Sequence, residues 1–296
     1  MTADFGATLV DIGARLGRTL SAQRAAPVSG GCINTAWRLC CDDGDVFLKT
    51  NAPDRLAMFE AEAEGLAELA RADGLRVPRV LGAGSSGTIA WLALEYVETG
   101  TAASGTERRL ATGLALQHGK LADRFGWHRD NTIGSTPQPN ATAESWPAFF
   151  AGQRLGFQLD LARERGWPRS MIDSGRRLQQ RLDAFFDDQR PEPALLHGDL
   201  WGGNWATDTR GAPFVFDPAV YYGHREADIA MTRLFGGFGA DFYAVYHERW
   251  PRQPGEEVRC ELYNLYHVLN HLNLFGAAYQ AQAEQMIGRL LAEAGI

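Results

Sequence analysis

His197-Gly198-Asp199-Leu200-Trp201-Gly202-Gly203-Asn204 is the run of residues on which the interpretation of this chain depends. Asp217 follows it thirteen residues later, at the end of an apolar stretch. A carboxylate, an amide five residues on and a second carboxylate after a short strand can together present a base and two metal ligands to one point. A surface loop rich in Gly, Asn and Asp is the alternative, because turns favour these residues.

The spacings are those of phosphoryl-transfer enzymes. In protein kinases a His, an Asp two residues on and an Asn five residues after that form the catalytic loop, and a metal-binding Asp follows a short strand. Asp199 would orient an alcohol and accept its proton during attack on the γ-phosphate of ATP. Asn204 and Asp217 would hold Mg²⁺, which prefers hard oxygen ligands. We therefore predict a kinase-type site with ATP and Mg²⁺ as cofactors.

Length and composition fit an intracellular enzyme of two lobes. A chain of 296 residues exceeds the usual size of one core, and we place an N-terminal nucleotide-binding lobe at 1–97 and a C-terminal catalytic and substrate lobe at 98–296. The formal net charge of −7 argues against nucleic-acid and anionic-membrane partners and suits a cationic substrate. The cysteines lack zinc spacing, and neither a secretory leader nor an apolar run of membrane-spanning length is evident, so we predict a cytoplasmic protein.

Lys49 is one of only two lysines in the chain, the other being Lys120. It closes the strand-like run Val46-Phe47-Leu48-Lys49. A compact ammonium at this place would reach the α and β phosphates of ATP, for which an arginine fork is a poor substitute. A solvated lysine at a strand end is the alternative.

A helix is predicted from about 54 to 72, because apolar residues recur there at three- and four-residue steps. Glu62 falls inside the apolar arc, where an unpaired carboxylate is costly, and we predict that it pairs with Lys49. In the alternative, Glu62 lies at the edge of the arc with its carboxylate in water. Three other acidic residues share the opposite face and are predicted to be a solvated run: Glu60, Glu64 and Glu68.

Two further segments are assigned to the nucleotide. In the turn at 29–35, Gly30, Gly31 and Asn34 are predicted to approach the phosphates, because glycine permits close approach of the backbone; a plain hairpin turn is the alternative. Cys32 in this turn is either a small core residue or a redox-sensitive thiol. The segment WLALEYV at 91–97 reads as a buried strand leading into a hinge, where backbone groups near Glu95 and Val97 would meet adenine.

Four residues are candidates for the substrate pocket. Trp201 would either stack on a sugar face or anchor its loop in the core. His224 and Glu226 follow a glycine in a polar segment and are expected to line the cleft. His271 lies four residues after His267 on an apolar helix, and the two are core or substrate-facing histidines; a metal pair is a weaker alternative, because no glutamate accompanies them.

Two residues are given supporting roles. Asp228 is predicted to hold the catalytic loop by hydrogen bonds, and His118 lies on an apolar stripe and is predicted to be a satisfied core histidine. Helices are predicted at 107–124, 146–165 and 171–188, with two or more after 227. The linker that contains Pro137 and Pro139 is predicted to be an irregular loop over a cleft.

Together these segments resemble the fructosamine kinase family (ketosamine-3-kinases), within the aminoglycoside-phosphotransferase-like branch of the protein-kinase-like fold. The resemblance covers nearly the whole chain. GGCINTAW, FLKTN and HGD are shared with many small-molecule kinases, whereas the LWGGN, FDPA-YYGH and IGS-PQPN segments are more specific. The segments that carry it are GGCINTAW (30–37), FLKTN (47–51), FGWHRDNTIGSTPQPN (125–140), LLHGDLWGGNW (195–205), FDPAVYYGHREADIAM (216–231) and LYHVLNHLNLFG (265–276).

The resemblance implies an α+β, bilobal fold: a small N-terminal lobe with an antiparallel sheet and one main helix, and a larger, mostly helical C-terminal lobe. It also implies an enzyme that uses ATP and Mg²⁺ to phosphorylate the 3-hydroxyl of ketosamines, a deglycation repair activity. The substrates would be ribulosamine, erythrulosamine or fructosamine adducts of small amines or of protein lysines. A kinase of another small alcohol, such as an aminoglycoside, choline or homoserine, and a non-catalytic nucleotide-binding module are the alternatives.

The chain departs from protein kinases in two places. Gly198 stands where the catalytic-loop arginine would be, and Pro218-Ala219 replaces the Phe-Gly that would follow Asp217. The arginine would link the loop to a phosphate on an activation loop. We therefore predict a constitutively assembled site without an activation-loop switch.

Overall fold

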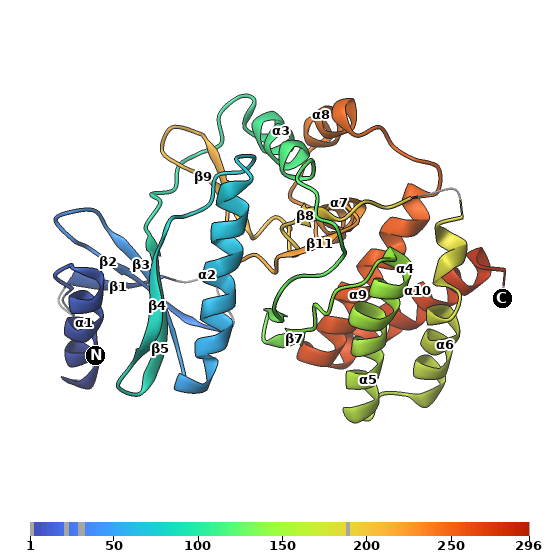
Figure 1. Ribbon diagram of the computed structural model, residues 1–296, viewed down its shortest axis with the longest axis horizontal. Helices are drawn as coiled ribbons and strands as arrows, with labels where there is room; N and C mark the ends of the chain where they lie inside the picture. The colour runs from blue at the N-terminus through green and yellow to red at the C-terminus, as the bar shows by residue number, and fades with distance from the viewer. Residues whose placement is uncertain (1–2, 21–23, 29–32, 188–189, 296) are drawn as a thin grey trace.

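The N-terminal part of the chain is an antiparallel sheet with helices on both faces (Figure 1). The structure is a computed structural model that describes residues 3–20, 24–28, 33–187 and 190–295. The strand order is β1-β2-β3-β5-β4, and every neighbouring pair is antiparallel. The strands are β1 (Ala25–Val28), β2 (Thr35–Leu39), β3 (Val46–Asn51), β4 (Val80–Ser86) and β5 (Ile89–Glu95).

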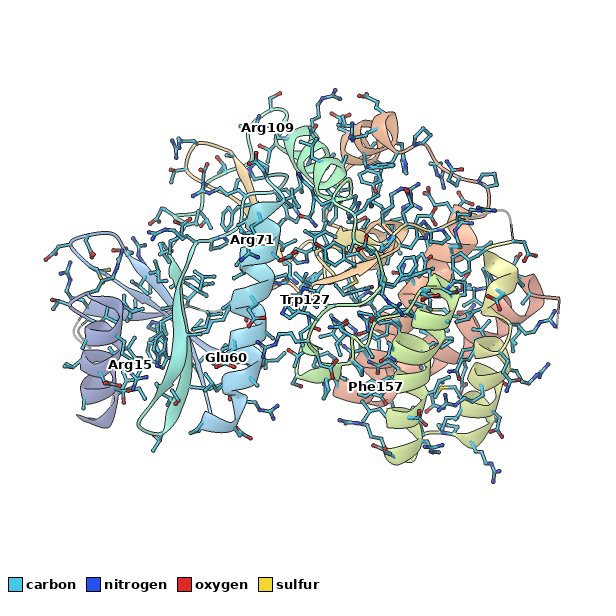
Figure 2. The ribbon with its side chains drawn as sticks, viewed as in Figure 1. Arg15, Glu60, Arg71, Arg109, Trp127 and Phe157 are labelled. Atoms are coloured by element: carbon cyan, nitrogen blue, oxygen red, sulfur yellow. The ribbon has the colours of Figure 1, made fainter. Side chains whose placement is uncertain are left out.

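Strand β5, which lies between β3 and β4, is buried on both faces of the sheet. Its side chains alternate between these faces and belong to two separate parts of the core. Trp91 and Ala93 pack with Leu9 and Ile12 of helix α1 (Ala3–Leu16). Their neighbours on β5 face the other way and pack with helix α2 (Leu56–Arg71). Figure 2 shows Arg15 on α1 and Glu60 on α2 on opposite sides of the sheet. Helix α2 is thus the main helix that was expected, and α1 is an additional helix on the second face of the sheet.

Helix α2 agrees closely with the helix predicted at 54–72. The 3₁₀ turn η2 (Pro53–Arg55) precedes it. Phe59, Leu66 and Leu69 form its buried stripe. The apolar period of the sequence was thus a correct guide to the face that meets the sheet.

The rest of the chain is mostly helical, as expected. Short two-stranded sheets lie between its helices. The structure bears out the predicted protein-kinase-like division into a sheet-containing part and a helical part. Its helical segments are α3 (Thr106–Gln117), α4 (Trp146–Phe149), the π-helical η3 (Phe150–Gly156), α5 (Phe157–Glu164), α6 (Arg169–Gln179), η4 (Leu182–Phe185), α7 (Glu226–Leu234), α8 (Ala240–Arg249), α9 (Glu256–Phe275), η5 (Ala277–Tyr279) and α10 (Gln280–Glu293).

Two predicted helices end early. The helix expected at 107–124 stops at Gln117, where the amides of Gly119 and Lys120 turn back onto the carbonyls of Leu116 and Gln117. Glycine is a poor helix former, which favours this stop. The helix expected at 171–188 ends at Gln179 and is followed by η4. The segment at 146–165 is helical almost throughout, with η3 as a wider turn in its middle.

The linker around Pro137 and Pro139 is a hairpin and not an irregular loop. Strand β6 (Asn131–Ile133) pairs with β7 (Thr136–Gln138), and Gly134 takes a positive φ of 62° at the turn between them. Asn131, Gln138 and Asn140 are buried and hydrogen-bonded to one another. The polarity of this segment therefore serves internal hydrogen bonds and does not indicate exposure to water.

Within the described part of the chain, we find no helix that is both long enough and apolar enough to span a membrane.

Candidate active site

The catalytic loop begins directly after β8 (Ala194–Leu196), which pairs with β11 (Tyr221–Gly223). Asp228, in the first turn of α7, accepts hydrogen bonds from the backbone amides of His197 (2.8 Å) and Gly198 (2.9 Å) and from His118 Nε2 (3.1 Å). Burial opposes ionisation of Asp228, but the hydrogen bonds outweigh it and hold its pKa below the usual value. The predicted supporting roles of Asp228 and His118 are thus both present in the structure.

Gly198 is required by the shape of this loop. Its φ is +82°, and a Cβ built on it would lie 2.0 Å from the carbonyl oxygen of Ala219. An arginine at this position has no room, so the departure from protein kinases is built into the backbone.

His197 is a structural residue of the loop. Its Nε2 donates to the carbonyl of Phe216 (3.1 Å), and its Nδ1 accepts from the amide of Asp199 (3.3 Å). These roles fix a neutral imidazole, and burial lowers the pKa of His197 in agreement. The histidine therefore ties the loop to the strand that precedes Asp217.

Asp199 and Asn204 face each other across the loop. The Asn204 amide donates to the Asp199 backbone carbonyl (2.8 Å) and to its carboxylate (3.1 Å). Burial, followed by repulsion from Asp217, raises the pKa of Asp199 to about 7. A carboxylate with this pKa is well matched to proton abstraction near neutral pH.

A hairpin returns the chain to this point, as predicted. Strand β9 (Trp205–Thr207) pairs with β10 (Pro213–Val215), and the amide of Phe216 donates to the carbonyl of Asn204 (3.0 Å). Asp217 follows with a positive φ of 55°, an uncommon conformation for a residue other than glycine. The loop and the hairpin thus bring Asp217 to the catalytic loop.

Asn204 and Asp217 offer a donor set that fits Mg²⁺. Among the described residues, no group of three or more His, Cys, Asp or Glu side chains is arranged to hold a metal. Mg²⁺ needs no such group, because phosphates and waters supply most of its oxygen ligands in nucleotide sites. One amide oxygen and one carboxylate that is 45% exposed are the kind of donors that such a site takes from the protein.

Lys49 joins the two lobes at this site. Its ammonium lies 2.6 Å from Glu62 Oε1 and 2.5 Å from Asp217 Oδ1. The Lys49 side chain is buried; burial opposes its charge, but the two carboxylates outweigh this and raise its pKa. The predicted pair of Lys49 and Glu62 is therefore present, and Asp217 is a second partner.

The turn that was predicted to approach the phosphates is described only in part. Gly30, Gly31 and Cys32 lie outside the described residues. Asn34 accepts a hydrogen bond from Asn51 Nδ2 (2.7 Å), which ties the turn to the end of β3.

At the hinge, Glu95 ends β5 and Val97 follows it, where the chain leaves the sheet. The Glu95 carboxylate lies 3.6 Å from Arg76 and 3.7 Å from Arg79. The backbone of both residues is thus located at the junction of the sheet and the helical part.

Trp201 and His271 lie in one group of rings that is partly exposed. Trp201 is 38% exposed, so it does not anchor its loop in the core. Its ring contacts Phe235 (6.0 Å between centroids), and Phe235 contacts His271 (5.0 Å). His271 also contacts two further rings, and we call this group the aromatic patch: Trp201, Phe235, His271, Phe275 and Tyr279. The last two and Phe235 were not predicted, although Phe275 follows His271 by one helical turn.

His224 and Glu226 do not line the cleft, which corrects the prediction. His224 is buried, and its Nδ1 meets the hydroxyl of Tyr263 (2.8 Å). Glu226 is buried in a two-pronged ion pair with Arg259 (2.7 and 2.9 Å). A polar segment after a glycine suggested exposure, but both groups find partners inside the helical core.

The acidic face of α2 is not simply a solvated run. Glu64 contacts His128 and Arg129 (3.0 and 2.7 Å), and Glu68 accepts a hydrogen bond from the hydroxyl of Tyr222 (2.7 Å). Glu60 is the most weakly engaged of the three, 3.9 Å from Arg129. Helical periodicity gave the right face, but a single sequence does not reveal that the other lobe meets it.

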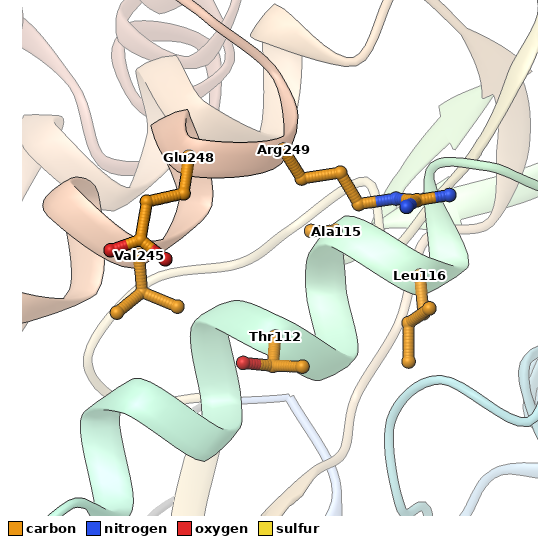
Figure 3. A pocket seen from close by; sticks show the side chains of 6 residues that line it. All are labelled: Thr112, Ala115, Leu116, Val245, Glu248 and Arg249. Carbon is orange, nitrogen blue, oxygen red and sulfur yellow. The ribbon is translucent and has the colours of Figure 1, made fainter.

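A groove of about 520 Å³ lies between α3 and α8 (Figure 3). It contains none of the predicted site residues, so we do not assign it to the active site. Its lining residues are Thr112, Ala115, Leu116, Val245, Glu248 and Arg249.

Comparison with known families gives a match over almost the whole chain. The model of the fructosamine kinase family matches residues 7–293. A relative from Synechocystis, named as a probable ketoamine kinase, is 46% identical over 93% of this chain and 92% of its own length. A chloroplastic protein-ribulosamine 3-kinase from Oryza sativa is 42% identical over 92% of this chain and 80% of its own length.

Solved structures agree with this match. A Haemophilus somnus protein provisionally assigned as a fructosamine-3-kinase superposes with a TM-score of 0.85 at 29% identity and covers 97% of both chains. The aminoglycoside phosphotransferase APH(4)-Ia superposes with a TM-score of 0.65 at 15% identity, covering 99% of this chain and 98% of its own. At that identity the likeness shows only a shared protein-kinase-like fold.

Proposed function

This chain belongs to the fructosamine kinase family, and from that premise we propose that it transfers the γ-phosphate of ATP to the 3-hydroxyl of a ketosamine. The observation that carries the proposal is the arrangement of four groups from three segments: the catalytic loop, the stretch that follows the β9–β10 hairpin, and strand β3. Asp199 and Asn204 contact each other, while Asp217 contacts Lys49. A structural loop has no need of this set, and phosphoryl transfer uses each member.

The chemistry assigned to the protein is proton transfer and positioning. The ionised Asp199 accepts the proton of the acceptor hydroxyl while that oxygen bonds to the γ-phosphorus and the bond to ADP breaks. Lys49, held by Glu62, reaches the α and β phosphates. Asn204 and Asp217 would hold Mg²⁺, which when bound offsets the charge of the phosphate oxygens. Contacts within the protein hold these groups, since Asn204 bonds to Asp199 and Lys49 pairs with Glu62 and Asp217.

The remaining nucleotide contacts are assigned by position. We place the phosphates against the turn with Gly30, Gly31 and Asn34, and the adenine edge against backbone groups of Glu95 and Val97. Support comes from the hydrogen bond of Asn34 to β3, which keeps that end of the turn near Lys49, and from the location of Glu95 at the end of β5.

The aromatic patch is assigned to the acceptor. Trp201 is two residues from Asp199 and is exposed, so its ring is available to stack on the sugar. His271 is assigned to the same site. The amine of a ketosamine is protonated at neutral pH, and ring faces attract such cations. Because Phe235 and Phe275 are also exposed, the patch leaves room for an amine that continues into a larger molecule, such as a glycated protein lysine.

Replacing Trp201 with Ala is expected to raise KM for the ketosamine about tenfold, the effect of losing roughly one ring contact to a cation or sugar face. KM for ATP should stay within about twofold, because Trp201 is assigned to the acceptor and not to the nucleotide. Trp201→Phe should retain most of the affinity. Steady-state kinetics with each substrate varied in turn measures the effect. Leu116→Ala, which changes an exposed residue of the groove between α3 and α8, is the matched control. If KM for the acceptor were unchanged in Trp201→Ala, the assignment of Trp201 to the acceptor site would be wrong.

We also propose that the enzyme acts in the cytoplasm. The described cysteines Cys40, Cys41 and Cys260 are free thiols, which suits a reducing compartment.

An acceptor panel tests the proposed function. The purified protein with Mg²⁺-ATP is given ribulosyl-lysine, fructosyl-lysine, an aminoglycoside, choline and homoserine, and ADP formation is measured. We expect turnover with the two ketosamines and none with the other three alcohols. Turnover with another alcohol alone would assign a different kinase activity, and nucleotide binding without turnover on any acceptor would assign a non-catalytic module.

A further inference from the structure

One of the segments with a specific sequence resemblance has no part in the chemistry described so far. It lies at 125–140 and contains the β6–β7 hairpin. Figure 2 shows Trp127, the residue before His128, in the stretch that passes beside α2. We call residues 128–140 the clamp, because side chains from this stretch hold two other elements at once.

The first element is α2. Arg129 Nη1 lies 2.7 Å from Glu64 Oε1, and His128 Nε2 lies 3.0 Å from Glu64 Oε2. A second Arg129 nitrogen donates to the carbonyl of Ala57 (3.4 Å) and lies 3.9 Å from Glu60. The clamp therefore grips about two turns of the helix, on the face turned away from the sheet.

The second element is the stretch directly after Asp217. Asn131 Nδ2 donates to the carbonyl of Val220 (2.8 Å), and Gln138 Nε2 donates to the carbonyl of Ala219 (3.1 Å). Helix α2 also approaches this stretch closely, since a Cβ on Gly65 would lie 3.1 Å from Val220. The clamp, α2 and the backbone of Ala219 and Val220 thus contact one another in one region.

The clamp is itself fixed to the helical part. The Tyr266 hydroxyl of α9 donates to Gln138 Oε1 (2.8 Å), and Arg154 of η3 donates to Asn140 Oδ1 (2.7 Å). Asn140 in turn donates to the carbonyl of Arg129 (3.1 Å). Since Gln138, Asn140 and Arg154 are buried, this network is well placed to keep Arg129 in one position.

The helical geometry links the clamp to Lys49. Glu62 and Glu64 are two residues apart, which places them about 200° apart around α2. Glu62 therefore points to Lys49 while Glu64 points to the clamp. A rotation of α2 that released Glu64 would move Glu62 as well.

We infer that Arg129 and Glu64 are positioning residues that hold α2 in the rotation at which Glu62 meets Lys49. The clamp also holds the backbone of Ala219 and Val220, which follow Asp217, the second partner of Lys49. In protein kinases, phosphorylation of the activation loop controls the position of the helix whose Glu pairs with the Lys. In this protein the clamp would position α2 in the same way, so the site needs no phosphorylated loop. This inference rests on the proposed function in so far as Lys49 serves ATP.

Arg129→Ala and Glu64→Ala test the inference. Each should lower kcat/KM for ATP about tenfold through a higher KM and a lower kcat, because a displacement of about 1 Å in catalytic groups can cost up to about 10²-fold. KM for the ketosamine should stay within about twofold. The double variant Arg129→Ala/Glu64→Ala should lose little more than either single variant. The exchange Arg129→Glu/Glu64→Arg should recover most of the loss, which a general loss of packing would not allow.

Arg124→Ala is the matched control. Arg124 forms a comparable pair with Glu144 (3.0 Å) in the same lobe, and the described contacts of that pair do not include α2. Wild-type kinetics in Arg129→Ala would overturn the inference. So would equal increases in both KM values that the charge exchange fails to rescue, because they would indicate a structural role only. Mg²⁺-ATP binding, measured by calorimetry on the same variants, separates this outcome from failure of the ketosamine assignment, since weaker binding in Arg129→Ala is expected whichever alcohol is the acceptor.

Discussion

Asp199→Asn is expected to lower kcat about 10³-fold, in the range for removal of a general base, and to leave KM for ATP within about twofold. The asparagine keeps the size of the side chain and its place opposite Asn204, but it cannot accept the proton of the acceptor hydroxyl. Steady-state phosphate transfer to ribulosyl-lysine measures the effect. The exposed Asp183→Asn is the control and should behave as the wild type. A variant of Asp199 that kept more than about a tenth of the activity would exclude it as the base.

The same substitution should change the pH profile. Burial and the nearby Asp217 raise the pKa of Asp199 to about 7, so the free enzyme loses its ionised base as the pH falls through that value. We expect kcat/KM for ATP, which reports the free enzyme, to decline below about pH 7 in the wild type. The residual activity of Asp199→Asn should lack this decline.

Lys49→Met should lower kcat/KM for ATP by about 10²-fold or more, as expected for the loss of a pre-positioned charge at a phosphate. Lys49→Arg should rescue little of the activity, because a planar fork does not replace a compact ammonium between two carboxylates. Kinetics with ATP varied at saturating ketosamine gives the measurement. Lys120→Met changes the only other lysine, which is exposed, and should have no effect.

Loss of stability has to be separated from loss of catalysis in this experiment. Lys49→Met leaves Glu62 as a buried carboxylate without its partner, and this is destabilising. Lys49→Met/Glu62→Leu removes both charges and should recover the melting temperature without recovering the activity. If the double variant regained activity together with stability, Lys49 would be a structural residue and its assignment to ATP would be wrong.

The sequence predicted those parts of the site whose residues lie close together along the chain. Asp199, Asn204 and Asp217 belong to one loop and one hairpin, so their relative positions follow from a short stretch of chain. Glu62 was found because an acidic residue within an apolar helical arc needs a partner, and Lys49 is that partner.

The features of the structure that the sequence did not predict depend on contacts between segments far apart in the chain. Glu64 meets His128 and Arg129 more than sixty positions away, and Glu226 meets Arg259 thirty-three positions away. Periodicity identifies a polar face but does not distinguish water from another lobe as its neighbour. Helix α1 was missed for a related reason: a buried strand at 91–97 indicates that both faces of the sheet are covered, but it does not identify the segment that covers the second face.

Phosphorus and proton NMR of ribulosyl-lysine incubated with the enzyme and Mg²⁺-ATP tests the central claim most directly. We predict one new phosphate ester, coupled to the proton on carbon 3 of the sugar, followed by release of free lysine as the phosphorylated adduct breaks down. Neither signal should appear with Asp199→Asn on the same time scale. Phosphate on a different hydroxyl, or no ester from ribulosyl-lysine or fructosyl-lysine while ATP is consumed with another alcohol, would contradict the account.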